Sequence, residues 1–148
     1  MLSSWSLLTF VHLIGLSLGV GAATVKLMLL VKAKSNPEFV ATYLKVMRPI
    51  TRIIIIGLIL LTLSGIAWIF TGVTFTTLFI IKLILVLAVW VLGPIIDNVV
   101  EPKYKNLAPA SGNQISAEFI RIQRKLVIIE TIATLDFYVI IMLGVLLL

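Results

Sequence analysis

Five ionisable side chains lie inside long apolar stretches of this chain, and their types are the ones that could do chemistry there. They are His12, Lys26, Lys82, Glu130 and Asp136. Inside a membrane, such a side chain is costly unless it faces a helix bundle, finds a partner or reaches the interface. These residues therefore indicate either structural ion pairs or sites for proton transfer, electron transfer or an anionic cofactor group.

The expected depth of each of these five residues in the membrane divides them into two groups. Lys26 and Glu130 have opposite charges and share one level, near the ends of their spans that adjoin the basic loops. Lys82 is expected to reach inward toward Asp136, with His12 at an intermediate level. Either pair can act as a buried ion pair that fixes helix register. The functional alternative is a site at His12, Lys82 and Asp136.

Small residues on the first span predict close packing. Gly15 and Gly19 are four residues apart, and they fall near one helix face with His12 and Lys26. This spacing lets another helix approach closely, or a flat ligand. We interpret Gly15 and Gly19 as helix-packing residues.

The usual catalytic arrangements have no counterpart in the sequence. The chain has one His, no Cys and no pair of carboxylates on one helical face, which leaves no hydrolytic triad or two-metal site. Without Cys it also has no thiolate metal site and no redox dithiol. The sequence contains no Gly-rich phosphate loop. We therefore expect a non-catalytic protein, without a metal unless His12 binds haem.

Composition predicts a membrane protein. Hydrophobic residues make up 61% of the 148 residues and charged residues 12%, and the mean hydropathy is +1.21. Soluble domains have about 45–50% apolar and about 25% charged residues. Four segments are long enough to cross a bilayer as helices, about 4–31, 53–70, 76–96 and 126–148. The expected fold is all-α, a single domain of four transmembrane helices.

The basic residues orient this bundle. Ten of the twelve Lys and Arg residues lie in the first and third connections. Short loops rich in Lys and Arg stay in the cytoplasm, which places both termini outside. The expected location is a prokaryotic-type plasma membrane. The expected partners are the lipid bilayer and other membrane subunits, and not nucleic acid, because the positive charge flanks membrane segments.

The connections between spans carry their own signals. Ser35 to Glu38 has the form of a capping box, which predicts a short amphipathic interfacial helix that Pro49 ends or kinks. The segment 97–114 contains Pro102, Pro109 and Gly112 and is predicted to be irregular. The last helix is expected to begin early, at a cap provided by Ser111, Asn113 or Ser116.

Two short motifs suggest a family. Phe10-Val-His12-Leu-Ile-Gly15, followed by Gly19-Val-Gly21, resembles the first helix of small membrane proteins in the CopD and HemJ-type protoporphyrinogen oxidase group. Ile81-Lys82-Leu-Ile-Leu-Val86 resembles the start of the third helix in that group. The resemblance implies that His12 ligates b-type haem and that Lys82 is an active-site or propionate-binding residue. This chain lacks the second His, which leaves a five-coordinate haem, an axial ligand from a partner chain, or loss of the cofactor.

Three functions are consistent with these observations. The first is an accessory or structural subunit of a larger membrane complex, for example an oxidoreductase. The alternative is a haem-binding redox protein or enzyme that uses His12, Lys82 and Asp136. The second alternative is a small proton-coupled transporter in which Asp136 and Lys82 form the switch.

Overall fold

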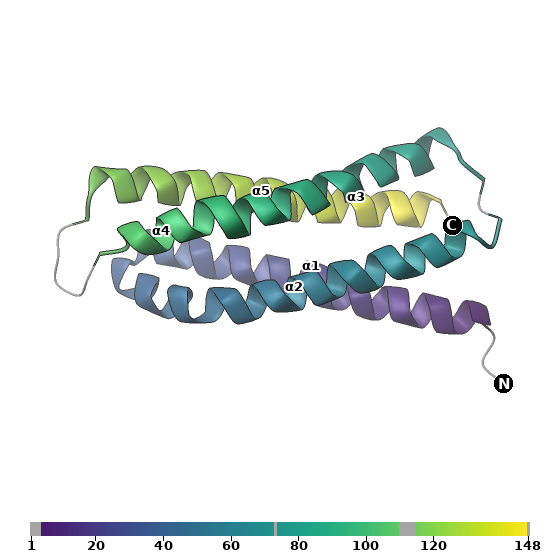
Figure 1. Ribbon diagram of the computed structural model, residues 1–148, viewed down its shortest axis with the longest axis horizontal. Helices are drawn as coiled ribbons and strands as arrows, with labels where there is room; N and C mark the ends of the chain where they lie inside the picture. The colour runs from purple at the N-terminus through teal and green to yellow at the C-terminus, as the bar shows by residue number, and fades with distance from the viewer. Residues whose placement is uncertain (1–3, 73, 110–114, 148) are drawn as a thin grey trace.

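The chain folds into four long helices. The computed structural model describes residues 4–72, 74–109 and 115–147, and every regular element in these ranges is helical (Figure 1). The long helices are α1 (Ser4–Ser35), α2 (Val40–Ile69), α3 (Thr77–Ile95) and α5 (Ala117–Leu146). All four are long and apolar enough to cross a membrane, with α3 lengthened by the elements that follow it. This confirms the predicted all-α bundle of four transmembrane helices.

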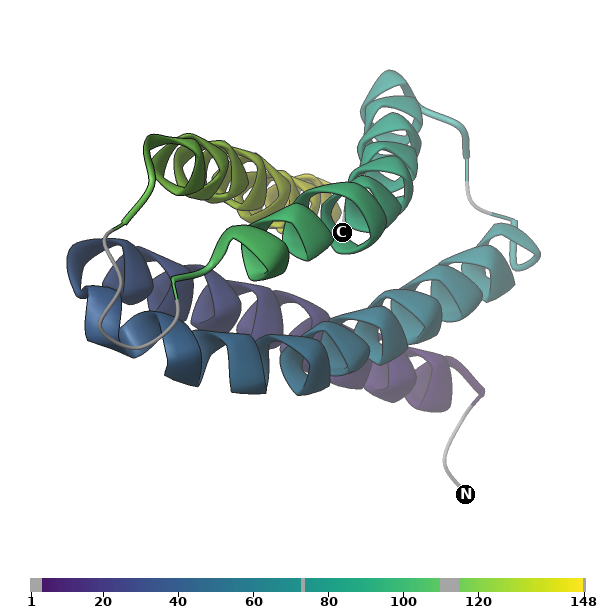
Figure 2. The ribbon, with the colours of Figure 1, turned by 60° about the vertical axis from the view of Figure 1, so that its left-hand side comes forward.

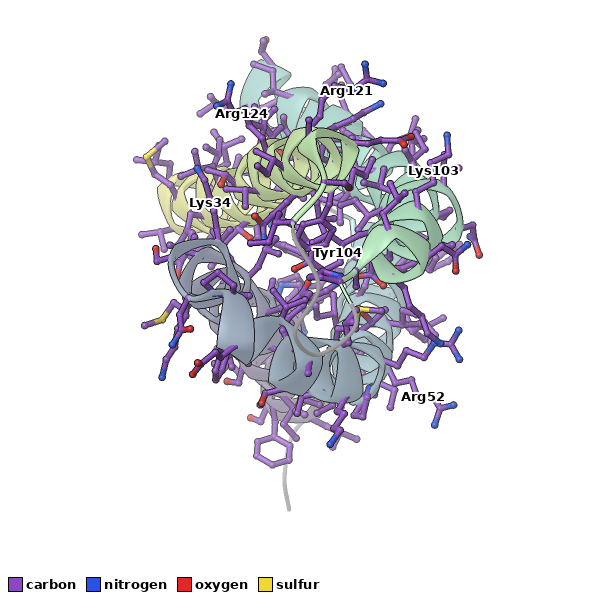
Figure 3. The ribbon with its side chains drawn as sticks, turned by 90° about the vertical axis from the view of Figure 1, so that its left-hand side faces the viewer. Lys34, Arg52, Lys103, Tyr104, Arg121 and Arg124 are labelled. Atoms are coloured by element: carbon purple, nitrogen blue, oxygen red, sulfur yellow. The ribbon has the colours of Figure 1, made fainter. Side chains whose placement is uncertain are left out.

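Successive long helices run in opposite directions. The α1–α2 and α4–α5 connections lie at one end of the bundle (Figure 1). The start of α1, the α2–α3 connection and the end of α5 lie at the other end. We call the first of these the basic end, because Lys34, Arg52, Lys103, Arg121 and Arg124 surround it (Figure 3).

The bundle consists of two helix pairs. Helix α1 packs along α2, α3 packs on α5, and contacts between α1 and α5 join the pairs. Helices α2 and α3 follow each other in sequence, but they diverge from the basic end toward their connection (Figure 2). Few direct contacts therefore join α2 to α3.

Glycines set the close approach of α1 and α2. A Cβ atom at Gly15 would lie 2.9 Å from the carbonyl oxygen of Gly57, and one at Gly57 would overlap the backbone of Gly19. Any larger side chain at these positions would push the helices apart. Gly15 and Gly19 therefore pack against a helix, as predicted, and Gly57 is the matching residue on α2.

The first connection is shorter than predicted. Asn36 caps the 3₁₀ turn Pro37–Phe39 by accepting a hydrogen bond from the Glu38 amide at 3.1 Å. The residues of the predicted interfacial helix then form the first turns of α2, which continues through Pro49. The apolar stripe of this segment faces the bundle, because Tyr43 and Met47 are buried in its core. A separate interfacial helix is therefore not present.

The segment after α3 is helical, where the sequence predicted an irregular loop. A π-helical stretch (Ile96–Val100) joins α3 to α4 (Glu101–Leu107) without a break. The Glu101 amide bonds the carbonyl of Ile96, five residues back. This wider turn lies where Pro94 and Pro102 would strain a regular α-helix, since proline lacks an amide hydrogen and its ring crowds the preceding turn.

The helix starts agree in part with the predicted caps. Ser116 accepts a hydrogen bond from the Phe119 amide at 3.1 Å and so begins α5. Thr76 caps α3 in the same way, bonding the Phe79 amide at 3.3 Å. Ser111 and Asn113 lie outside the described residues.

Aromatic side chains close the basic end of the bundle. Tyr43 and Tyr104 meet edge to face with their ring centroids 5.9 Å apart, and the Tyr104 ring stacks on Phe119 at 5.0 Å. All three side chains are buried. The Gln123 amide donates to the Tyr104 hydroxyl at 3.3 Å, which satisfies one polar group of this layer.

Candidate functional site

Lys26 is surrounded by three carboxylates. Its Nζ atom lies 2.5 Å from an oxygen of Glu101, 2.8 Å from one of Glu130 and 3.8 Å from one of Asp97. The predicted pair of Lys26 and Glu130 is present, and it belongs to a larger cluster. We call these four residues the Lys26 cluster.

The Lys26 cluster is enclosed by the bundle. Lys26 is 2% exposed, and the side chains of Glu101 and Glu130 are almost as deeply buried. Asp97 is the accessible member, with 25% of its side chain exposed. When all four groups are ionised, the cluster carries two negative charges in excess. Burying unbalanced charge is expensive, so this arrangement favours uptake of a proton or another cation.

Each member of the cluster comes from a different part of the fold. Lys26 projects from α1 and Glu130 from α5, while Asp97 and Glu101 come from the π-helical stretch and the start of α4. The sequence interpretation missed both of these acids because it treated their segment as a loop. Their spacing of four residues directly after an apolar span was the available signal, since it places both on one helix face.

Lys82 and Asp136 do not form the predicted pair. Within the described residues, neither side chain makes an ion pair or a hydrogen bond. The Nζ atom of Lys82 lies instead 3.2 Å from the position of a Cβ atom at Gly144, about 12 Å along α5 from Asp136. The Lys82 side chain extends toward the nearer end of the bundle, as long lysine side chains in membranes do. It can take this path because Gly144 has no side chain to block it.

Asp136 receives no hydrogen bond from the hydroxyl side chains near it on α5. Its Oδ1 atom is enclosed and has no hydrogen-bond partner. Thr131 donates to the carbonyl of Val127 at 2.7 Å, and the Tyr138 hydroxyl bonds Thr24 on α1 at 2.9 Å. The three predicted residues His12, Lys82 and Asp136 therefore do not form one hydrogen-bonded site.

His12 is held between α1 and α2. Its Nδ1 atom shares a hydrogen bond of 2.8 Å with the Ser64 hydroxyl, and its ring lies 4.8 Å from that of Trp68. The Ser64 hydroxyl already donates to the carbonyl of Leu60 at 2.7 Å. The His12 Nδ1–H is therefore assigned as the donor to Ser64.

The surroundings of His12 restrict how it could ligate the haem that the resemblance implies. Its Nδ1 atom is engaged with Ser64, so a haem iron would have to bind Nε2, in the plane of the imidazole ring. The backbone of α2 at Gly57 and Leu61 fills the Gly15 face of α1, and Trp68 lies against one face of the His12 ring, so neither position is open to a haem. In the described part of the chain, no group of three or more His, Cys, Asp and Glu side chains could hold a metal ion.

Comparisons with known proteins add no further identification. No protein-family model matches the chain, and neither the curated proteins nor the solved structures contain a significant match.

The Lys26 cluster gives a prediction about stability. Replacing Lys26 by Met should lower the free energy of unfolding by about 3–5 kcal/mol, because three buried carboxylates would lose their counter-charge. Lys103, which is exposed near the same end, provides the matched control, Lys103→Met. Unfolding by dodecyl sulfate in mixed micelles, followed by circular dichroism, measures both. Equal effects of the two substitutions would contradict the prediction.

Proposed function

We propose that this protein is a small non-catalytic subunit of a larger complex in a cell membrane. The observation that carries the proposal is the unpartnered carboxylate of Asp136 in the middle of α5. A carboxylate at this depth is costly without a partner, and intramembrane ionisable groups normally face a protein neighbour or a water-filled cavity. A donor on a neighbouring chain would complete the environment of Asp136.

The surface of α5 beside Asp136 is suited to such a neighbour. Ile132, Leu135 and Val139 are exposed there, at 52%, 58% and 40% of their surfaces. A membrane helix lying along this apolar strip could bring a hydrogen-bond donor or a cation to the Asp136 carboxylate. Polar contacts between membrane helices then add orientation to an interface that van der Waals packing provides.

The kind of complex follows from the resemblance alone. The first-helix motif around His12 is similar to that of a haem-associated oxidoreductase group, so we propose an oxidoreductase complex as the example to test first. Haem binding by this chain itself has less support, because the chain has a single His and the backbone of α2 closes the Gly15 face of α1 beside it. A proton-coupled switch made of Lys82 and Asp136 also has less support, because these side chains are not paired.

The orientation is part of the proposal. The basic end, where Lys and Arg are concentrated, is proposed to face the cytoplasm of a prokaryotic-type cell, which puts the α2–α3 connection outside. The two ends of the bundle carry unequal charge. Within the described residues, the α2–α3 connection has no Lys or Arg.

The partner prediction is tested on native membranes. A tagged chain extracted in mild detergent should migrate on native gels well above its own mass of 16.3 kDa plus detergent, together with other subunits. The variant Asp136→Leu should reduce the recovered partners about tenfold, a loss of the size expected for a hydrogen bond to a charged group. Glu118→Leu changes an exposed acid on the same helix and should retain them. A monodisperse chain without partners would contradict the proposal, as would a complex that Asp136→Leu leaves intact.

The orientation prediction uses the absence of natural cysteines. A cysteine introduced at the exposed position Thr74 should react with a membrane-impermeant maleimide on intact cells. A cysteine at the exposed position Ser35, at the basic end, should react only after the cells are permeabilised. The reverse pattern would contradict the proposed orientation.

A further inference from the structure

A cleft opens between the two helix pairs where α2 and α3 diverge. It has a volume of about 390 Å³, and its lining includes Lys26, Asp97 and Glu130 from the Lys26 cluster. Pockets for small organic ligands have volumes of about 300–1,000 Å³. The cleft is therefore large enough for such a ligand, with charged groups on one wall.

The charged wall favours a positively charged ligand. Lys26 can neutralise only one of the three carboxylates around it. Asp97 is the carboxylate farthest from the ammonium, at 3.8 Å, and also the most exposed. It is therefore the group best placed to meet a ligand that enters the cleft.

A buried hydroxyl provides an independent sign of a missing ligand. Thr134 lies one helical turn after Glu130 and also lines the cleft. It is 4% exposed, and its Oγ1 atom has no hydrogen-bond partner. Thr51, across the cleft on α2, has a second enclosed hydroxyl without a partner. Buried polar groups normally have partners, so these two hydroxyls indicate that the cleft receives a polar or charged group of a ligand.

The rest of the lining is apolar, which favours an organic cation over a bare metal ion. Leu58, Val89 and Phe137 form its inner surface, and the Trp90 ring lies at its side. A bare metal ion prefers several converging oxygen ligands. The three acids of the Lys26 cluster converge on the Lys26 ammonium instead, and no group of three or more His, Cys, Asp and Glu among the described residues could hold a metal ion. An organic cation can instead place its apolar body against these side chains and its charge near Asp97, with Trp90 available for a cation–π contact.

We propose that this cleft binds a monovalent organic cation with an apolar body, such as a lipophilic amine or a quaternary ammonium compound. Asp97 and Glu130 would neutralise the charge of the ligand, and the hydroxyl oxygen of Thr134 would face its cationic group. This inference goes beyond the proposed subunit role and does not depend on it, because Asp136 does not line the cleft.

The proposal is tested with the purified full-length chain in mild detergent and tetraphenylphosphonium as the probe. We expect saturable binding of one equivalent, measured by equilibrium dialysis of the radiolabelled probe against protein-free micelles. The anion tetraphenylborate has nearly the same shape, and in a separate dialysis, since the two ions precipitate together, it should not bind saturably. Sodium chloride should displace the probe no more than choline chloride does at the same ionic strength.

Variants identify the site. Asp97→Asn should weaken binding about tenfold, as expected for the loss of one charged contact. Glu118→Gln, which changes an exposed acid far from the cleft, should leave the affinity unchanged. Ile55, exposed at the mouth of the cleft, can be enlarged in Ile55→Trp, which should also weaken binding about tenfold without altering the Lys26 cluster. This second variant keeps the proposal testable if Asp97→Asn does not fold.

Four results would overturn the proposal. The first is no saturable binding above that of empty micelles, and the second is saturable binding of tetraphenylborate with equal affinity. The third is an affinity unchanged in both Asp97→Asn and Ile55→Trp. Displacement by sodium but not by choline would indicate an inorganic cation site and would overturn the organic ligand. Each result concerns the isolated chain, so none of them bears on the subunit role tested through Asp136.

Discussion

The packing of this bundle depends on a single buried ammonium group. Lys26 projects from α1 and contacts acids on the α3–α4 segment and on α5, so it joins the two helix pairs that otherwise meet mainly along α1 and α5. An ion cluster of this kind is sensitive to geometry, because each buried charge is tolerated only while its partners stay close. The glycines of α1 and α2 set the spacing of one pair, and the Lys26 cluster sets how that pair meets the other.

The same cluster explains why one side of the bundle stays open. Helices α1 and α5 are drawn together at the level of Lys26, whereas α2 and α3 diverge and share no ion pair, their side-chain hydrogen bond being the one that Trp90 donates to Thr62 at 3.0 Å. The divergence leaves a cleft with charged groups on one wall and apolar side chains over most of the rest. Asp136 lies outside this cleft, on a different part of α5. The chain therefore has two separate polar features inside the membrane, one suited to a small cation and one suited to a protein neighbour.

Much of the fold was predictable from sequence because lipid imposes strict rules. The need to satisfy backbone groups internally fixes four helices, and the Gly15–Gly19 spacing indicates close packing. The pairing of Lys26 with Glu130 followed from their shared depth. The acids Asp97 and Glu101 were missed because Pro94 and Pro102 are local signals for a helix break. In the structure the helix continues past both prolines through a π-helical turn. The direction of Lys82 was also missed, since a flexible side chain is placed by the space beside Gly144, which only the tertiary structure reveals.

The claim that Lys26 unites the bundle through charge is tested most directly by restoring neutrality. Lys26→Met should be measured alone and together with Glu101→Gln and Glu130→Gln, using the free energy of unfolding in mixed micelles. If the balance of charge determines the stability of the bundle, the combined variant should be more stable than Lys26→Met alone, because two of the uncompensated carboxylates have been removed. If the combined variant is less stable than Lys26→Met, the side chains contribute mainly through packing, and the account is contradicted.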